Sequence, residues 1–207
     1  MSIPVVVFAK APEPGLTKTR LVPALGADGA ARLHRVLVRR ALATATTANI
    51  GPTILACAPD IADPFFGACA QEFGVVLEMQ GDGDLGDRMS RAFERHAPAV
   101  LIGTDCPALT ASHLREAGRA LALGLDAALA PAEDGGYVLI GLARAAPEIF
   151  RDMSWGGADV LAATRTRMAK ADLVCTELPL LWDVDRPEDL ARLRQRFPAL
   201  IAEAGLA

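Results

Sequence analysis

Short apolar runs alternate with helical segments along the whole chain, and this alternation limits the fold more than any other feature. The runs have the length and the Val, Ile and Leu content of buried strands. They occupy residues 3–9, 52–58, 75–79, 99–104, 126–132, 135–142 and 172–178. Apolar side chains at helical spacing predict helices over residues 27–48, 63–73, 84–97, 111–123, 158–171 and 186–205, the last with a break near Pro198. Strands separated by helices predict right-handed βαβ units, and therefore a three-layer α/β/α fold around a mainly parallel sheet.

The length of 207 residues suits one domain, so we expect a single domain over residues 1–207. Hydrophobic residues make up 52% and charged residues 22%, which is typical of a globular chain. We expect no membrane span, since no apolar stretch is long enough, and no signal peptide, since the N-terminus lacks a basic region. The four cysteines are scattered without a CxxC pair, which favours a reduced, cytoplasmic protein. A net charge of −4 argues against a nucleic-acid-binding protein.

The loop after the first strand is strongly basic. Residues 10–40 carry seven Lys or Arg and two acids, a charge of +5, whereas the rest of the chain carries 14 and 23, or −9. Lys10, Lys18 and Arg20 lie on this loop, which we expect to be flexible, and Gly15 lets backbone N–H groups approach an anion. The loop matches neither the G-x-x-x-x-G-K-[ST] nor the G-x-G-x-x-G pattern. A phosphate site and an exposed basic surface both remain open at this point.

A carboxylate follows a second apolar strand. In α/β sheets ligands bind at the carboxyl ends of the strands, and Asp105 lies directly after the run 99–104. Such a carboxylate can bind Mg²⁺ while substrate phosphates and water complete the octahedron. Asp105 could instead satisfy the loop backbone or cap the next helix, but Thr110 is better placed for the cap, so we favour the metal. Cys106 has no histidine close in sequence, which disfavours a catalytic cysteine.

A second pair of carboxylates lies near the C-terminus. Asp183 and Asp185 are two residues apart and share a face if the segment is extended. Asp185 also resembles a helix cap, because Glu188 follows three residues later and Pro187 suits a first helical turn. Either aspartate could supply a second carboxylate to a metal.

Three glycine-rich stretches complete the set of candidate site segments. Residues 80–89, QGDGDLGDRM, follow a strand and open a helix, so they either contact a base or ribose or form a tight turn. Residues 132–141, AEDGGYVLIG, place Glu133 and Asp134 before a glycine pair that suits either a ligand or a bend at the strand start. Residues 154–160, SWGGADV, combine Trp155 with glycines at a helix start, where an anion or sugar could bind.

Taken together, these stretches resemble one family along nearly the whole chain. The shared motifs are FAKAPEPGLTKTRLVPALG, GDLGDRM, LIGTDCPAL, EDGGYVLIGL, SWGG and WDVDRPEDL. The chain resembles the GT-A-type family labelled radical-SAM/selenodomain-associated transferase 1, within the nucleotide-diphospho-sugar transferase superfamily. Its characterised look-alikes are the 2-phospholactate guanylyltransferases and the molybdenum-cofactor nucleotidylyltransferases. Those enzymes carry a loop similar to GGxGTRL, of which Thr19–Leu21 survive here while APEPGL replaces the glycines.

The resemblance implies a GT-A (Rossmann-like) fold with about seven strands, one of them antiparallel, and Mg²⁺ or Mn²⁺ at Asp105. Catalytic candidates are Lys18, Arg20 and Asp105, and the metal ligands would be Asp105 with Asp183 or Asp185. Nucleotide-binding candidates are Ala9, Lys10, Gly15, Lys18, Arg20, Gly81, Asp84, Gly103, Thr104 and Asp105. Acceptor-binding candidates are Glu133, Asp134, Gly135, Gly136, Tyr137, Trp155 and Gly156.

These observations predict a metal-dependent transferase that acts at the phosphates of a nucleotide. The retained KTRL favours nucleotidylyl transfer from an NTP to a small phosphorylated acceptor. Glycosyl transfer from a nucleotide-diphospho-sugar is the alternative, and a non-catalytic nucleotide-binding protein is a third. The sequence names neither the base nor the acceptor, and a homodimer stays open.

Overall fold

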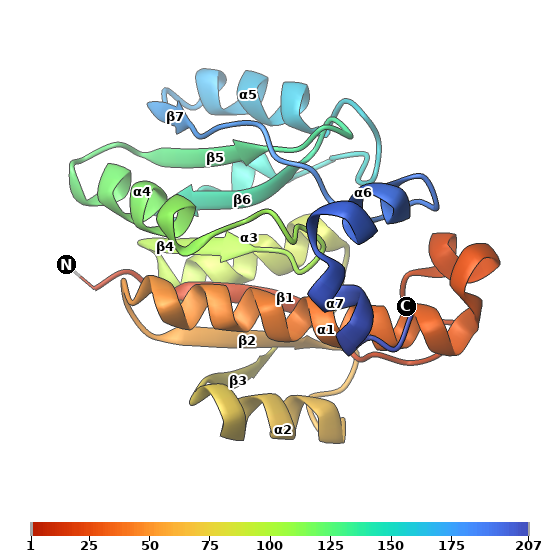
Figure 1. Cartoon of the computed structure of the whole chain (residues 1–207). Coiled ribbons are helices and arrows are strands. Elements are labelled where there is room, and N and C mark those ends of the chain that lie inside the picture. Colours follow the sequence, from red (N-terminus) through yellow and green to blue (C-terminus); the bar gives the residue numbers. More distant parts are fainter. Residues whose placement is uncertain (1, 207) are drawn as a thin grey trace.

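The structure, a computed structural model, describes residues 2–206 and contains a seven-stranded mixed sheet flanked by helices (Figure 1). The strand order is β3-β2-β1-β4-β6-β5-β7, and β6 is antiparallel to both of its neighbours while all other pairs are parallel. The strands are β1 (Val5–Lys10), β2 (Thr53–Ala58), β3 (Val76–Met79), β4 (Ala99–Ile102), β5 (Ala127–Pro131), β6 (Tyr137–Leu142) and β7 (Cys175–Glu177). The expected α/β class and the single antiparallel strand are therefore confirmed.

Helices cover both faces of the sheet because alternate strand residues point to opposite sides. Val5 and Val7 of β1 pack under α1 (Val22–Ala48), α2 (Pro64–Phe73) and α4 (Ala111–Ala122). Val6 packs on the opposite face, against α3 (Leu85–His96) and α5 (Val160–Lys170). Figure 1 shows α1 and α4 in front of the sheet and α3 behind it. No helix in residues 2–206 has both the length and the hydropathy needed to cross a membrane.

The closing segment packs against the start of α1. It forms α6 (Asp189–Arg196) and α7 (Pro198–Glu203), separated at Phe197, so the predicted break near Pro198 is confirmed. Leu193, Leu200 and Trp182 form an apolar cluster with Leu33 and other residues of α1.

The basic loop is more ordered than expected. The Thr17 hydroxyl donates to the Glu13 carbonyl over 3.1 Å, and Leu21 is fully buried at the end of a short 3₁₀ helix, η1 (Thr19–Leu21). Helix α1 then starts at Val22 instead of residue 27, with a non-helical Gly26 between its first turn and its regular part. The expectation of a flexible loop did not take into account the buried Leu21 side chain, which holds the end of the loop against the core.

Four chain segments meet at one edge of the sheet. Strands β1 and β4 are parallel neighbours, so Lys10 and the residues after Ile102 emerge together. Strand β6 is antiparallel and therefore starts at this edge, where Ile102 is paired with Leu139. The segment before α6 crosses the same edge, because Leu181 N donates to Pro131 O over 2.9 Å and Val184 N donates to Asp105 O over 2.8 Å.

Candidate active site

A cleft of about 600 Å³ opens at the carboxyl ends of β1 and β4. Many of the residues that the sequence nominated line it, namely Ala9, Lys10, Lys18, Arg20, Asp84, Gly103, Thr104, Asp105 and Asp185. Gly81 lines a neighbouring cavity of about 350 Å³ that shares Lys10 and Thr17 with the cleft, whereas Gly15 lines neither. Residues that the strand-end rule selected from distant parts of the chain therefore lie together in one cleft.

Lys18 crosses the floor of the cleft. Its Nζ lies 2.9 Å from Asp105 Oδ1 and also donates to the Val184 carbonyl, so only 3% of the side chain is exposed. The residue has a left-handed backbone conformation (φ 49°) at the start of η1. This conformation turns the side chain inward, whereas the neighbouring Arg20 side chain remains 56% exposed.

The Asp105 carboxylate is ionised and still accessible. Burial alone would raise its pKa, but Lys18 outweighs burial and holds the pKa of Asp105 below its usual range. Lys18 and the Thr104 hydroxyl both contact Oδ1, and Oδ2 has no protein hydrogen-bond partner in residues 2–206. With 43% of the side chain open to the cleft, Oδ2 is available to a ligand or cation.

Asp183 and Asp185 have different surroundings. The Asp185 carboxylate pairs with Arg20, and the N–H groups of Asp185 and Arg186 are instead bound by Asp189. The reading of Asp185 as a helix cap is therefore wrong. Burial, followed by the negative charges of Asp134 and Asp105, raises the pKa of Asp183 to about 6.

Two of these carboxylates are candidates for a divalent cation, although Asp105 lines the cleft and Asp183 does not. The described residues contain no group of three or more His, Cys, Asp or Glu side chains placed to hold a metal. Asp105, with its free Oδ2, and Asp183, whose charge is repelled by neighbouring carboxylates, are the residues that could hold one. Mg²⁺ and Mn²⁺ accept oxygen ligands of this kind, and Mg²⁺ usually takes its other ligands from phosphates and water.

His34 and Arg88 also line the cleft, although the sequence analysis nominated neither. The buried His34 ring donates from Nε2 to the Lys10 carbonyl over 3.0 Å, and its Nδ1 has no partner. Burial lowers the pKa of His34, although the negative charge of Asp105 opposes this effect. Arg88 belongs to the quoted GDLGDRM motif and donates to the Gly83 carbonyl over 3.1 Å. The motif could have revealed Arg88, but helical periodicity does not show where a lone histidine points.

Asp84 has a structural task besides lining the cleft. Its carboxylate accepts from Asp87 N over 2.9 Å, and Asp87 in turn accepts from Asp84 N over 3.1 Å. This reciprocal pair is a capping box that starts α3.

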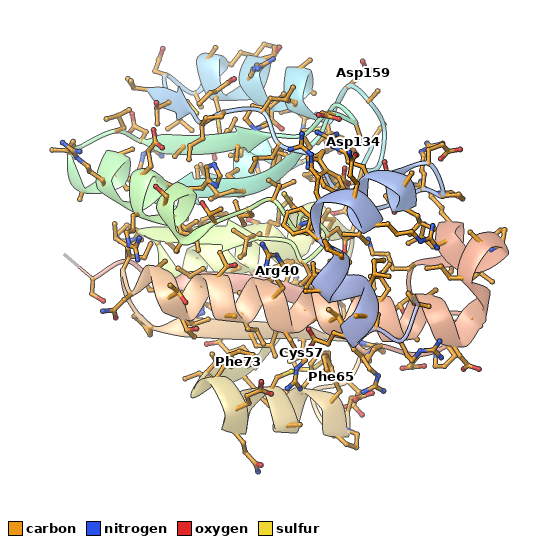
Figure 2. The ribbon with its side chains drawn as sticks, viewed as in Figure 1. Arg40, Cys57, Phe65, Phe73, Asp134 and Asp159 are labelled. Atoms are coloured by element: carbon orange, nitrogen blue, oxygen red, sulfur yellow. The ribbon has the colours of Figure 1, made fainter. Side chains whose placement is uncertain are left out.

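The predicted acceptor segments adjoin a second cavity of about 200 Å³. Its lining includes Asp134, Gly136, Tyr137, Trp155 and Gly156. Figure 2 labels Asp134 at the end of the sheet, near α6.

Two of the predicted acceptor residues do not line this cavity. Glu133 instead forms a two-contact ion pair with Arg192, at 2.7 and 3.1 Å. Gly135 (φ 90°) lies so close to Ala158 that a Cβ would come within 2.0 Å of its carbonyl oxygen. Glycine is thus required there by the backbone, and not by a ligand in the cavity.

Cys106 does not have the surroundings of a nucleophile. Burial raises the pKa of its thiol to about 11, so little thiolate exists at neutral pH.

A family model described as "Uncharacterized protein conserved in bacteria (DUF2064)" matches residues 41–157. The chain belongs to this family. A solved structure from Desulfovibrio desulfuricans, assigned to the nucleotide-diphospho-sugar transferases, is 31% identical with a TM-score of 0.84, over 99% of this chain and 96% of that one. The DUF2064 chain therefore has the fold that its motifs implied. No curated protein matches it in sequence.

More distant structures share the fold of this DUF2064 protein. A nucleotidyl transferase from Methanothermobacter has a TM-score of 0.61 at 14% identity, covering 96% of this chain and 98% of that one. Glucosyl-3-phosphoglycerate synthase from Mycobacterium tuberculosis, solved with Mn²⁺, UDP and phosphoglyceric acid, has a TM-score of 0.55 at 12% identity, covering 100% and 79%.

Proposed function

We propose that this protein is a transferase that acts at the phosphates of a nucleotide donor bound in the cleft. The observation that carries the proposal is the placement of Lys10, Lys18, Arg20 and Arg88 around a floor formed by Asp105. Cations offset the charge of phosphates, and a carboxylate among them suits a metal that bridges the same phosphates. The 31% identical structure and the fold shared with nucleotidyl and glycosyl transferases support a nucleotide-related transferase.

The proposed metal is Mg²⁺ or Mn²⁺, held by Asp105 and Asp183. The free Oδ2 of Asp105 and the raised pKa of Asp183, caused first by burial and then by the charges of Asp134 and Asp105, support this choice over Asp185, whose carboxylate is paired with Arg20. A distant structure that contains Mn²⁺ together with UDP is consistent with it. Such a cation would draw charge from the phosphates as the leaving group departs.

The protein residues supply positioning and electrostatics. Lys18 and Arg20 lie where they would offset the negative charge that develops on a departing pyrophosphate or nucleoside diphosphate. Lys10 and Arg88, which also line the neighbouring 350 Å³ cavity, would help to orient the donor. The protein does little covalent chemistry in such a reaction. The rigid placement of charges is what lowers the barrier.

Nucleotidylyl transfer is the first candidate reaction, because Thr19–Leu21 keep the TRL of the nucleotidylyltransferase loop. Glycosyl transfer is the second, supported by the assignment of the 31% identical structure to the nucleotide-diphospho-sugar transferases. The two reactions release different products. Incubation of the protein and Mg²⁺ with a small-molecule extract should yield pyrophosphate from an NTP in the first case, and NDP from an NDP-sugar in the second.

The Asp105→Ala variant tests the site within this assay. We expect kcat to fall by at least about 100-fold with the fold retained, because the cleft loses its floor carboxylate. The exposed Glu116 on α4 gives a matched control, and Glu116→Ala should keep full activity. Full activity of Asp105→Ala would exclude the metal assignment. Nucleotide binding by the wild type without metal-dependent turnover would instead indicate a non-catalytic nucleotide-binding protein.

A further inference from the structure

The 200 Å³ cavity is a side chamber of the cleft. Phe8, Leu85 and Gly103 line both spaces, so the chamber adjoins the cleft, and a molecule in the chamber would lie next to the donor. An engineered protein cavity of about 150 Å³ holds one benzene molecule, so this chamber has room for a one-ring compound or an aliphatic chain of similar size.

The wall of the chamber is apolar and has no positive charge. It consists mainly of Phe8, Leu85, Met89, Leu101, Tyr137, Val138, Leu139, Ile140, Trp155 and Val160. None of its lining residues, all within residues 2–206, is Lys, Arg or His, and its single charged side chain is Asp134. A phosphate group placed there would lose its hydration without gaining a cation, and it would face a carboxylate.

Two polar atoms of residues on the wall lack partners. Trp155 Nε1 and the Tyr137 hydroxyl are buried without a hydrogen bond in the described structure. The Tyr137 hydroxyl lies beside Thr164, whose own hydroxyl donates to Val160 O over 2.8 Å, and Trp155 Nε1 lies against Gly86; neither Thr164 nor Gly86 lines the chamber. These two atoms are therefore not assigned to a ligand, and the apolar wall without positive charge alone defines what the chamber accepts.

We infer that the chamber binds the acceptor, and that the acceptor is a small, uncharged, largely apolar alcohol or phenol. This inference rests on the proposed function and departs from the phosphorylated acceptor that the sequence suggested. The acceptor oxygen would form a bond to the donor α-phosphorus as the bond to pyrophosphate breaks, or to the anomeric carbon as the bond to NDP breaks. The leaving group takes the electron pair, and the hydroxyl proton passes to Asp134, the one carboxylate on the wall.

Benzyl alcohol and benzyl phosphate form a matched pair of probes for this test. The indole N–H signals of the two tryptophans can be followed by NMR, and a Trp155→Phe variant identifies the Trp155 signal. Benzyl alcohol should shift that signal with a millimolar Kd, as expected for so small a ligand, and benzyl phosphate and glucose should bind more weakly. NTP and NDP-sugar binding, measured separately on the same sample, reports on the cleft alone.

Leu85 allows the charge of the chamber to be changed without disturbing the core, because it is 44% exposed at the shared wall. Leu85→Lys should raise the Kd of benzyl alcohol by about fivefold or more, since a charge would then face an apolar ligand. Leu123→Lys, at a 69% exposed position on the C-terminal end of α4, controls for the added charge.

The outcomes separate the two proposals. Tighter binding of benzyl phosphate or glucose than of benzyl alcohol, or no shift of the Trp155 signal with any probe, would overturn the inference. If a nucleotide still bound and was turned over in the presence of metal in either case, the proposed function would stand. If the wild type binds no NTP and no NDP-sugar, the proposed function itself is wrong.

Discussion

Lys18 combines a costly backbone conformation with the best-placed cation of the cleft. A left-handed conformation costs a non-glycine residue about 1–2 kcal/mol, and here it brings Nζ to Asp105 and Val184. A glycine at this position would relieve the backbone cost while removing the cation. Lys18→Gly is therefore a variant that should fold and yet test the charge of the cleft.

The neutral state of His34 predicts a pH-dependent stability. Burial lowers its pKa below the ordinary value of about 6.5, so the unfolded chain binds a proton that the folded chain does not. The free energy of unfolding should therefore decrease as the pH falls below about 6.5. In His34→Gln this contribution is absent, so the variant should lose less stability than the wild type between about pH 7 and pH 5.

Urea unfolding at several pH values measures this difference. His96 and His113 are present in both proteins and cancel in the comparison. Parallel stability curves for the two proteins would show that folding does not lower the pKa of His34, which would contradict its burial as a neutral ring.

The residues of the cleft were predictable in part. Lys10, Lys18, Arg20 and Asp105 follow strands, and the rule that ligands bind at strand ends was sufficient to select them. His34 lies in the middle of a helix, and its contact with the Lys10 carbonyl depends on how α1 packs on the sheet. The partner of Asp185 is Arg20, 165 residues away, and no local pattern reveals such a pair.

At the scale of elements, the start of α3 offers a direct test of local structure. Asp84→Ala removes the carboxylate that accepts from Asp87 N, and the loss of such a cap costs about 1 kcal/mol of stability. Urea unfolding should show a loss of this size. Asp82→Ala is the matched control, since Asp82 lies in the same loop outside the capping box and contributes only its carbonyl, to Arg91.

Equal stability of the two variants would contradict the capping role of Asp84. A loss of nucleotide affinity in Asp84→Ala with unchanged stability would identify it as a ligand-binding residue instead.

Periodicity predicted the helices and strands well but not the connection between them at the site. Apolar spacing placed α3 and α4 within a residue or two of their observed ends. The segment 178–185 has no such period, and hydrogen bonds to Leu129, Pro131 and Asp105, together with the packing of Trp182 and Val184, hold it across the sheet edge. Its course therefore follows from tertiary contacts that the sequence of the segment does not encode locally.

At the scale of the molecule, the sheet brings separated charges together. The alternation of elements predicted a mainly parallel sheet and the family resemblance implied one antiparallel strand, whereas the position of β6 between β4 and β5 follows only from the structure. This order places the basic loop after β1, Asp105 after β4, and Asp134 before β6 at one edge. A chain with a net charge of −4 thereby presents a cleft surrounded by Lys10, Lys18, Arg20 and Arg88.

Calorimetric titration of NTPs and NDP-sugars, with and without Mg²⁺, tests this account most directly. We predict that at least one of them binds the wild type more tightly with Mg²⁺, and that Lys18→Gly raises its Kd by about tenfold or more while the variant remains folded. Arg115→Gln, a change on α4 where Arg115 donates to the Thr47 and Ala48 carbonyls at the C-terminal end of α1, should bind as the wild type does. Failure of every nucleotide to bind, or equal affinity of Lys18→Gly, would contradict the assignment of the cleft as a nucleotide site.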